Sequence, residues 1–341
     1  MKDSLNIAIA GATGYVGLEL IKILSKHPKA KILYLCANRS AGKKIYNFDK
    51  KITKKNLPTI TRVKNINWNR INIIFTALPN GEAQKIAKEI PSHVKLIDLS
   101  ADFRLNDHKI YKKWYGKNHK CKELIKKSLY SITEFSKEQI HKYKIISCPG
   151  CYPTSVYLPL VPLLKKRMIK TSNITIDSKS GYSGAGNKIK NKFKFKNLFD
   201  SVSAYGIGSH RHTAEIDQEL SKISKKKVRV FFTPHLIPMF RGILSTIYLE
   251  TTKKNNAEKI YKFLKNYHKK NFFIKIAKFN SSIGTGSVMN TNNCYISVCK
   301  NREKNRIIII SVIDNLIKGA SGQAVQNMNV SFKIKETHGL T

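Results

Sequence analysis

The fold is decided near the N-terminus by the stretch Leu5-Asn6-Ile7-Ala8-Ile9-Ala10-Gly11-Ala12-Thr13-Gly14-Tyr15-Val16-Gly17. Its first six residues have the apolar character of a short buried strand, and the next seven are a G-x-x-G-x-x-G turn. An amphipathic helical pattern and a second apolar strand at residues 31–36 follow. Glycines between a strand and a helix allow a tight turn and a close approach to a pyrophosphate at the helix N-terminus. The stretch therefore predicts a βαβ unit of a dinucleotide-binding domain, with a purely structural glycine turn as the alternative.

The cofactor is predicted from this turn and from the residues after the second strand. NAD-specific sites usually carry an Asp or Glu at that point, whereas this chain has Arg39 and Ser40. A guanidinium and a hydroxyl can bind the 2′-phosphate of NADP, so NADP(H) is favoured over NAD, although Arg39 could also be an ordinary surface arginine. The residues of the turn expected to contact the cofactor are Gly11, Thr13, Gly14, Tyr15, Val16 and Gly17.

A candidate nucleophile lies in the middle of the chain, in Cys148-Pro149-Gly150-Cys151-Tyr152-Pro153-Thr154-Ser155. The apolar run before it predicts a strand and the run from Val156 to Lys166 predicts a helix, so Cys151 is expected at a strand-to-helix elbow. A helix N-terminus favours the thiolate, which is the reactive form of cysteine. The alternatives are a buried structural cysteine and a redox or zinc role for the C-x-x-C pair, but no second C-x-x-C is present.

Further ligand-binding candidates lie at the ends of predicted strands. Two strands, Ile71–Leu78 and Val94–Asp98, lead to Pro79 and to Arg104, which could clamp a carboxylate or pair with Asp102. A Gly/Ser loop at residues 178–187 contains Ser180, Ser183 and Gly184 and suits phosphate or cofactor recognition, or is only a connector. The block His210-Arg211-His212-Thr213-Ala214-Glu215-Ile216 offers an acid/base and a cation. Two histidines this close could bind a metal, but no carboxylate or thiolate has obvious ligand spacing, so no metal is expected.

The predicted elements indicate two domains of different class. Residues 1–148 alternate strands and helices, as expected of a Rossmann-type α/β domain, whereas residues 149–314 contain long strands with few helices. We therefore expect an α+β catalytic and dimerisation domain with a mainly antiparallel sheet. A helix of small residues near the C-terminus is expected to return to the NADP-binding domain, which makes that domain discontinuous, with residues 315–341 as its second segment.

The composition excludes several classes of protein. The chain of 341 residues carries 63 Lys and Arg against 21 Asp and Glu, a formal net charge of +42. These basic residues are spread along the chain and do not form one stripe, so we expect an anionic substrate and no specific nucleic acid. No apolar run approaches the roughly 20 residues of a membrane span, and no leader-like segment precedes the first strand. Six cysteines are too few for a disulfide framework, so a cytoplasmic protein is expected.

These motifs resemble those of the N-acetyl-gamma-glutamyl-phosphate reductases, in their longer type, a family related to the aspartate-semialdehyde dehydrogenases. The His-Arg-His and Pro-His-Leu-Ile-Pro-Met blocks separate the first family from the second. Cys148 is a departure, because many members carry Asn there. The blocks that carry the resemblance follow the family's order over nearly the whole chain: Gly11–Gly17, Pro149–Thr154, His210–Ile216, Pro234–Met239, Arg241–Leu244 and Asp314–Gln323.

The resemblance implies an activity: NADPH-dependent reductive dephosphorylation of N-acetyl-γ-glutamyl phosphate to N-acetylglutamate 5-semialdehyde, in arginine biosynthesis. Cys151 would form a thioester with release of inorganic phosphate, and His210, or as second choice His212, would transfer protons. Asn315 would hold the nicotinamide carboxamide, and a homodimer or homotetramer is expected. The substrate-binding candidates are Arg104, Ser180, Arg211, His212 and Glu215.

Two alternatives stay open at this point. One is another acyl-phosphate reductase on the same scaffold, acting on aspartyl phosphate or on a carrier-bound glutamyl or aminoadipyl phosphate. The other is a basic nucleic-acid-binding protein built on a Rossmann domain.

Overall fold

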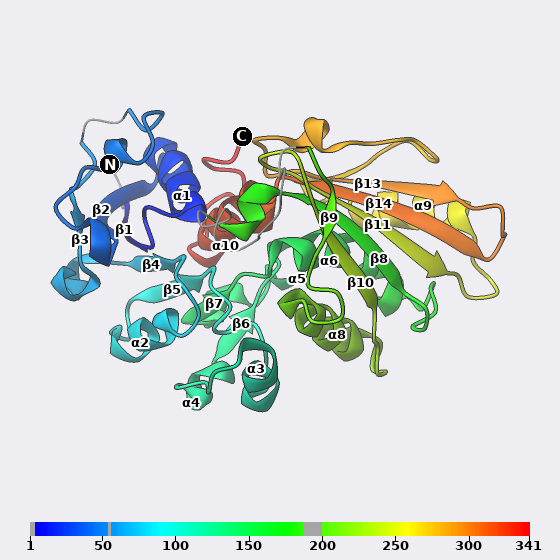
Figure 1. Ribbon diagram of the computed structural model, residues 1–341, viewed down its shortest axis with the longest axis horizontal. Helices are drawn as coiled ribbons and strands as arrows, with labels where there is room; N and C mark the ends of the chain where they lie inside the picture. The colour runs from blue at the N-terminus through cyan, green and yellow to red at the C-terminus, as the bar shows by residue number, and fades with distance from the viewer. Residues whose placement is uncertain (1–3, 54–55, 187–199) are drawn as a thin grey trace. The chain divides into compact units, whose positions relative to one another are not determined.

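The computed structural model describes residues 4–53, 56–186 and 200–341. The chain divides into two compact units, Met1–Pro149 with Ala320–Thr341, and Gly150–Gly319. Each unit contains one seven-stranded sheet (Figure 1). The second boundary lies five residues later than the sequence indicates, because Asp314 and Asn315 bond to Arg241 and to Gly242 of the second unit.

The sheet of the first unit is entirely parallel, with the order β3-β2-β1-β4-β5-β7-β6. The order reverses between β1 and β4, and the carboxyl ends of parallel strands at such a point form a crevice that binds ligands. The fold class predicted for this part of the chain is thereby confirmed. The strands are β1 (Leu5–Ala10), β2 (Ala30–Cys36), β3 (Ile60–Thr61), β4 (Ile73–Thr76), β5 (Lys95–Asp98), β6 (Ser128–Tyr130) and β7 (Ile145–Ser147).

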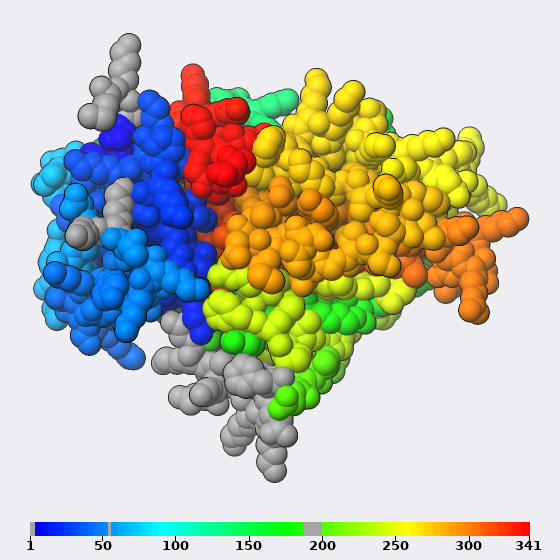
Figure 2. All heavy atoms as spheres, turned by 90° about the horizontal axis from the view of Figure 1, so that it is seen from above, coloured from blue at the N-terminus to red at the C-terminus, as the bar shows by residue number. Residues whose placement is uncertain are grey.

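Helices cover both faces of this sheet. Ile7 and Ile9 of β1 face the cluster that contains α1 (Tyr15–Lys26) and α10 (Gly322–Ser331). Ala8 and Ala10 of the same strand face α2 (Glu82–Glu89). This alternation is the period-2 pattern of a strand buried on both sides. The C-terminal residues, red in Figure 2, accordingly lie beside the blue residues of α1, so the last helix does return to this unit.

Several short elements between Leu105 and Tyr143 have no clear signal in the sequence, since residues 105–143 are charged and irregular. Helix α3 begins after the cap Asp107, whose carboxylate accepts from Lys109 N at 2.7 Å, and it ends at Gly116 with a positive φ of 68°. The helices of this segment are α3 (His108–Tyr115), α4 (Lys122–Ile125) and α5 (Thr133–Ser136). The 3₁₀ turns of the unit are η1 (Asn38–Ser40), η2 (Ile45–Asn47), η3 (Val63–Asn65), η4 (Trp68–Arg70) and η5 (Ile140–Lys142).

The sheet of the second unit is mixed, with the order β12-β13-β14-β11-β8-β10-β9. Strand β11 pairs antiparallel with β14 and with β8, whereas β8 and β10 run parallel. A mainly antiparallel sheet is therefore confirmed, with two parallel pairs within it. Its strands are β8 (Thr175–Gly181), β9 (Ser203–Ala204), β10 (Phe231–Ile237), β11 (Ile243–Glu250), β12 (Ile274–Ile276), β13 (Cys294–Lys300) and β14 (Arg306–Ile313).

Strand β10 begins only at Phe231, although the run of β-branched and aromatic residues begins at Val228. Val228 and Val230 bond instead to Ser221 and Asp217 of the preceding helix, and pairing with the sheet begins only at Phe231. The remaining elements of the unit are α6 (Cys151–Lys165), η6 (Tyr182–Ala185), α8 (Arg211–Ser224), α9 (Ala257–Tyr267) and η7 (Thr285–Val288), with the π-helical turn η8 (Ile317–Ser321) spanning the boundary between the two units.

Helix α6 is the central helix of the second unit. It packs on α8, α9 and β11, and thirteen of its fifteen residues are buried, from Tyr152 to Leu164. Three hydroxyls join the helix to the sheet, because Ser155 and Ser178 each lie 2.7 Å from the Oγ of Ser245. Residues from α9 to β13 form a continuous surface of this unit, yellow to orange in Figure 2.

Candidate active site

Cys151 is the first residue of α6, and Gly150 is its N-cap. The side chain of Cys151 is partly exposed, whereas the rest of the first turn is buried. Pro153 occupies the first turn, where a missing N–H costs no intrahelical bond. The dipole at the N-terminus of this fifteen-residue helix stabilises negative charge on the sulfur. The structure therefore has Cys151 at a helix start, where the sequence predicts it.

His212 and Glu215 lie against the peptide that precedes this cysteine. The Glu215 carboxylate is fully buried, and its Oε2 accepts a hydrogen bond from Gly150 N at 3.0 Å. The Nε2 atom of His212 lies 3.8 Å from the other carboxylate oxygen, Oε1. A Cβ on Gly150 would come within 2.3 Å of that Nε2, so only glycine leaves room for the imidazole. Tertiary packing thus brings a base and a carboxylate to the nucleophile's elbow.

His210 has a different environment. It is the N-cap of α8, and its Nδ1 accepts a hydrogen bond from His212 N at 3.2 Å, so in the neutral ring the proton is on Nε2. The rings of Tyr152, Tyr205 and Phe232 surround it at centroid distances of 5.3–5.6 Å. Burial, followed by the nearby cations His212 and Arg211, lowers the pKa of His210 to about 3. The ring is therefore neutral at physiological pH.

The Gly/Ser loop meets the segment after β14 within the second unit. Ser183 Oγ accepts from Asn315 Nδ2 at 3.0 Å, and Asn315 Oδ1 accepts from Gly242 N at 2.7 Å. A Cβ on Gly184 would lie 3.2 Å from Ser180 Oγ and 3.7 Å from Asn315 Nδ2. Four predicted site residues are thus brought together. Ser180, Ser183 and Asn315 are nearly fully buried, and Asn187 lies outside the described residues.

Arg241 and Asp314 form an ion pair that supports this arrangement. Arg241 Nη1 lies 3.2 Å from Asp314 Oδ2 and 2.8 Å from Asn290 Oδ1, and the Asp314 carboxylate is fully buried. Asp314 Oδ1 also accepts from Leu316 N at 2.9 Å, which fixes the residues on either side of Asn315. Sequence reasoning did not assign a role to this pair. The two residues are 73 positions apart, and no local pattern connects them.

The glycine turn of the first unit has the geometry that a dinucleotide requires. Gly11 has a φ of +88°, and a Cβ there would lie 2.2 Å from the carbonyl oxygen of Ala77, so a side chain is excluded. Gly14 caps α1 without a side-chain hydrogen bond, which leaves the helix N-terminus available to an anion. Thr13, Tyr15, Val16 and Gly17 belong to this turn or to the first turn of α1. These residues fit a nicotinamide dinucleotide.

Arg39 and Ser40 lie in η1, directly after β2. Arg39 is exposed, and within residues 4–53, 56–186 and 200–341 it forms no ion pair. A guanidinium in this position is available to a phosphate. The strand that precedes Arg39, β2, is paired with β1, and its end bonds to the glycine turn, because Gly11 N and Ala12 N both donate to Cys36 O.

Pro79 and Arg104 follow neighbouring strands of the same sheet. Pro79 is exposed in the loop before α2, whereas Arg104 is buried and its Nη2 donates to Leu99 O at 3.0 Å. Asp102, the expected alternative partner of Arg104, caps α2, because its carboxylate accepts from Gly81 N and Ala83 N. The loops after β4 and β5 are therefore joined by a buried carboxylate.

Cys148 is buried in the core of the first unit. Its side chain is 1% exposed, and Asn327 Nδ2 of α10 lies 3.5 Å from its sulfur. Burial raises the pKa of Cys148 to about 12. The sulfur is therefore a neutral thiol held inside the core, an environment unlike that of a reactive redox cysteine.

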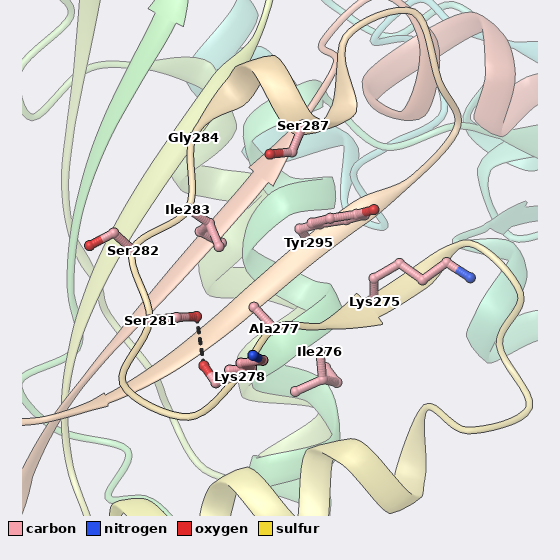
Figure 3. A pocket seen from close by; sticks show the side chains of 10 residues that line it. All are labelled: Lys275, Ile276, Ala277, Lys278, Ser281, Ser282, Ile283, Gly284, Ser287 and Tyr295. Carbon is pink, nitrogen blue, oxygen red and sulfur yellow. Dashed lines mark hydrogen bonds between the residues drawn. The ribbon is translucent and has the colours of Figure 1, made fainter.

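A cavity of about 570 Å³ in the second unit shares no residue with the predicted site (Figure 3). It is lined by β12, the loop that follows it and Tyr295 of β13.

Among the described residues, no group of three or more His, Cys, Asp and Glu side chains could hold a metal ion. The helices in the described part of the chain include none with the length and apolar character of a membrane span.

Two domain families match the chain. Residues 6–143 match the family described as semialdehyde dehydrogenase, NAD binding domain. Residues 151–315 match semialdehyde dehydrogenase, dimerisation domain. The two families follow the division between the two units.

Relatives with named activities cover the whole chain. N-acetyl-gamma-glutamyl-phosphate reductase of Ehrlichia canis is 43% identical over all of this chain and 99% of its own length. The probable chloroplastic enzyme of that name from Arabidopsis thaliana is 43% identical over 99% of this chain and 84% of its own.

Solved structures with the same fold are more distant in sequence. Aspartate semialdehyde dehydrogenase II of Vibrio cholerae has a TM-score of 0.72 at 19% identity, over 97% of this chain and 99% of its own. Aspartate semialdehyde dehydrogenase of Candida albicans, solved with NADP, has a TM-score of 0.73 at 16% identity, over 97% and 100%.

Proposed function

The chain belongs to the N-acetyl-gamma-glutamyl-phosphate reductase family, and from this premise we propose that it reduces N-acetyl-γ-glutamyl phosphate to N-acetylglutamate 5-semialdehyde, with release of inorganic phosphate, in arginine biosynthesis. The observation that supports the chemistry best is the position of Cys151 at the start of α6, with His212 and Glu215 at the preceding peptide. The protein is thus an oxidoreductase that acts on an acyl phosphate.

Cys151 is the nucleophile of this reaction. Its thiolate attacks the acyl carbon, the bond from that carbon to the phosphate oxygen breaks, and a thioester forms as inorganic phosphate leaves. The helix N-terminus stabilises the thiolate before attack and the oxyanion that develops during it. After reduction of the thioester carbon, the carbon–sulfur bond of the thiohemiacetal breaks and releases the aldehyde.

His212 is the acid/base in preference to His210. Its Nε2 lies against Gly150, and the buried Glu215 carboxylate, 3.8 Å away, would stabilise the imidazolium. His210 accepts a hydrogen bond at Nδ1 and has a pKa lowered to about 3, so it is a poor proton acceptor near neutral pH. His210 then acts by positioning α8. Ser180 and Arg211 are the candidates of this unit for binding the substrate's carboxylate and phosphate.

NADPH is the reductant. When bound, it supplies a hydride to the thioester carbon. The Gly11–Gly17 turn would hold the pyrophosphate, and Arg39 with Ser40 would bind the 2′-phosphate. Pro79, Ser183, Gly184 and Asn315 are the further cofactor contacts, although the amide of Asn315 already bonds to Ser183 and Gly242. Arg104 remains a substrate-binding candidate of the first unit.

The enzyme acts as a homodimer or homotetramer through the sheet of the second unit. Tyr248 of β11 pairs in register with Ile308 of β14, and both point away from the face that contacts α6 through Ser245. Tyr248 is 41% exposed and Phe231 of the same sheet is 65% exposed. Large apolar side chains on an open sheet face favour an interface.

All six cysteines are free, which supports a reducing compartment and a cytoplasmic enzyme.

One assay tests this function. Formation of NADPH from NADP, inorganic phosphate and N-acetylglutamate 5-semialdehyde is measured for the wild type, for Cys151→Ser and, as matched control, for Cys148→Ala. Cys151→Ser should lose turnover and keep NADPH binding, because a hydroxyl is a far weaker nucleophile here. Cys148→Ala should stay active. More than about a tenth of wild-type activity in Cys151→Ser would contradict covalent catalysis at this residue. Aspartate semialdehyde as a better substrate would identify a different acyl-phosphate reductase.

A further inference from the structure

A basic cleft lies between α3 and α4 in the first unit, with a volume of about 510 Å³. Every side chain that lines it is basic or carries an amide: His108, Lys109, Lys112, Lys113, Asn118, His119 and Lys122. No carboxylate and no apolar side chain is among these residues. A concave site of this size is within the range of small-molecule pockets.

The four lysines of this cleft are all exposed. Within residues 4–53, 56–186 and 200–341, none of Lys109, Lys112, Lys113 and Lys122 forms an ion pair. Lys109 and Lys113 are four residues apart on α3, so their charges lie on one face of the helix and repel each other. By contrast, Lys22, Lys137 and Lys170 each pair with a carboxylate. The cleft therefore keeps a concentrated positive charge.

The floor and the rim of the cleft are fixed. His119 is 3% exposed, its Nε2 bonds to Asp102 O at 2.8 Å and its Nδ1 accepts from Cys121 N at 3.1 Å. Burial lowers the pKa of His119, so the floor is neutral. At the rim, Asp107 is engaged in capping α3, where its carboxylate accepts from Lys109 N. The cleft's charge thus comes from exposed lysine ammonium groups beside a buried, hydrogen-bonded histidine.

This cleft is distinct from the dinucleotide turn of the same unit. The turn follows β1, and Arg39 follows β2, whereas α3 and α4 lie between β5 and β6 in the chain (Figure 1). In the sheet order, β2 and β5 are separated by β1 and β4. A ligand of the cleft would therefore not occupy the cofactor site.

We propose that the α3–α4 cleft binds a small anion that carries two or more linked phosphate groups. Lysine is well suited to such a ligand, because each ammonium is a compact charge with three donors that can adjust to different phosphate oxygens. The lining contains no Phe, Tyr or Trp ring on which a base could stack, and its lysines favour recognition through the phosphates. Helix α3 has eight residues and is about 12 Å long, which matches a short phosphate chain better than an extended nucleic acid.

The proposal is tested by calorimetry on the full-length protein with inorganic tripolyphosphate as the probe, and with ATP in a parallel titration. The test variant is Lys109→Gln/Lys113→Gln, and the matched control is Lys253→Gln/Lys254→Gln, an exposed pair of the second unit that removes the same charge. The cleft variant should weaken tripolyphosphate binding at least about tenfold, which corresponds to the loss of two charge-assisted contacts. The control should change it less than about twofold, because a distant exposed charge is screened by salt.

NADPH binding provides the readout that separates the two sites. The cleft variant should bind NADPH like the wild type, which also shows that it is folded, and Arg39→Ala should leave tripolyphosphate binding unchanged. Binding of ATP as well as tripolyphosphate in the cleft would show that a nucleotide is accepted, and binding of tripolyphosphate alone would show that an inorganic chain is preferred. Either result supports the proposal. Equal weakening by both double variants, loss of binding in Arg39→Ala, or cleft-dependent binding of an oligonucleotide without binding of tripolyphosphate would overturn it.

Discussion

At the scale of single residues, the two histidines that flank Arg211 differ in what their rings can do. His210 uses one nitrogen as a helix cap and is packed among aromatic rings, whereas the Nε2 of His212 lies at the elbow of the nucleophile. The family resemblance implies His210 as the acid/base, with His212 as second choice. The geometry supports the opposite assignment, because a general acid/base must lie within reach of the reacting group.

The first prediction compares these histidines. His212→Asn should lower kcat by roughly 10²–10⁴-fold, the usual contribution of a general acid/base. His210→Asn should retain most activity, because Asn is also a good N-cap and keeps α8 in place. Steady-state kinetics at pH 7 measures both, and NADPH binding serves as the folding control. If the larger loss occurs in His210→Asn, the roles are reversed.

A second residue-scale prediction concerns Arg39, which is exposed and has no ion-pair partner in the described residues. Arg39→Ala should raise the KM for NADPH by about 10–100-fold, the value of a charge-assisted hydrogen bond, and leave the weaker NADH reaction nearly unchanged. Arg302→Ala, an exposed arginine of the second unit, is the control. Equal losses with both cofactors would show that Arg39 supports the fold and does not read the 2′-phosphate.

At the scale of elements, the end of β5 carries a buried carboxylate with an unusual environment. Asp98 is fully buried, and its Oδ1 accepts from Thr76 Oγ1 and Ser100 N. Its Oδ2 has no hydrogen-bond partner among the described residues. Burial, and then the negative charge of Asp102, raise the pKa of Asp98 to about 6. Asp98 therefore keeps its proton to a higher pH than an aspartate in water does.

This raised pKa predicts a pH dependence of stability. Between about pH 4 and 6 the folded protein binds the Asp98 proton and the unfolded chain does not, so the free energy of unfolding falls as pH rises through this window. Asp98→Asn keeps the bonds at Oδ1 and should remove roughly 1–3 kcal/mol of that decrease. Urea unfolding from pH 4 to 7 measures it, with the exposed Glu303→Gln as control. A parallel pH dependence in wild type and Asp98→Asn would show that Asp98 titrates normally.

At the scale of the whole molecule, the second unit presents apolar side chains on the sheet face that points away from α6. Tyr248→Asp would place a charge opposite Ile308 and should convert the expected dimer into monomers, because an unpaired charge buried in an interface is strongly unfavourable. Sedimentation velocity measures the change. Tyr46→Asp, which alters an aromatic residue that is 51% exposed in the first unit, is the control. A wild type that sediments as a monomer would contradict the interface.

The sequence alone determined the family, the fold class and most strand and helix positions. The turn from β1 to α1 is readable because glycine spacing and strand periodicity are local properties, and Gly11 must be glycine at a φ of +88°. The elbow at Cys151 is readable for the same reason. Residues 105–143 were not readable, because α3 and α4 are short and carry few apolar positions.

Only the tertiary structure decided which side chains meet. Glu215 reaches Gly150 across 65 positions, Asp314 reaches Arg241 across 73, and Asn327 reaches the sulfur of Cys148 across 179. The parallel pairing of β8 with β10 and the cluster of lysines at the α3–α4 cleft depend in the same way on how elements pack. Periodicity and turn chemistry act over a few residues, whereas these contacts form only when distant elements bury their apolar faces together.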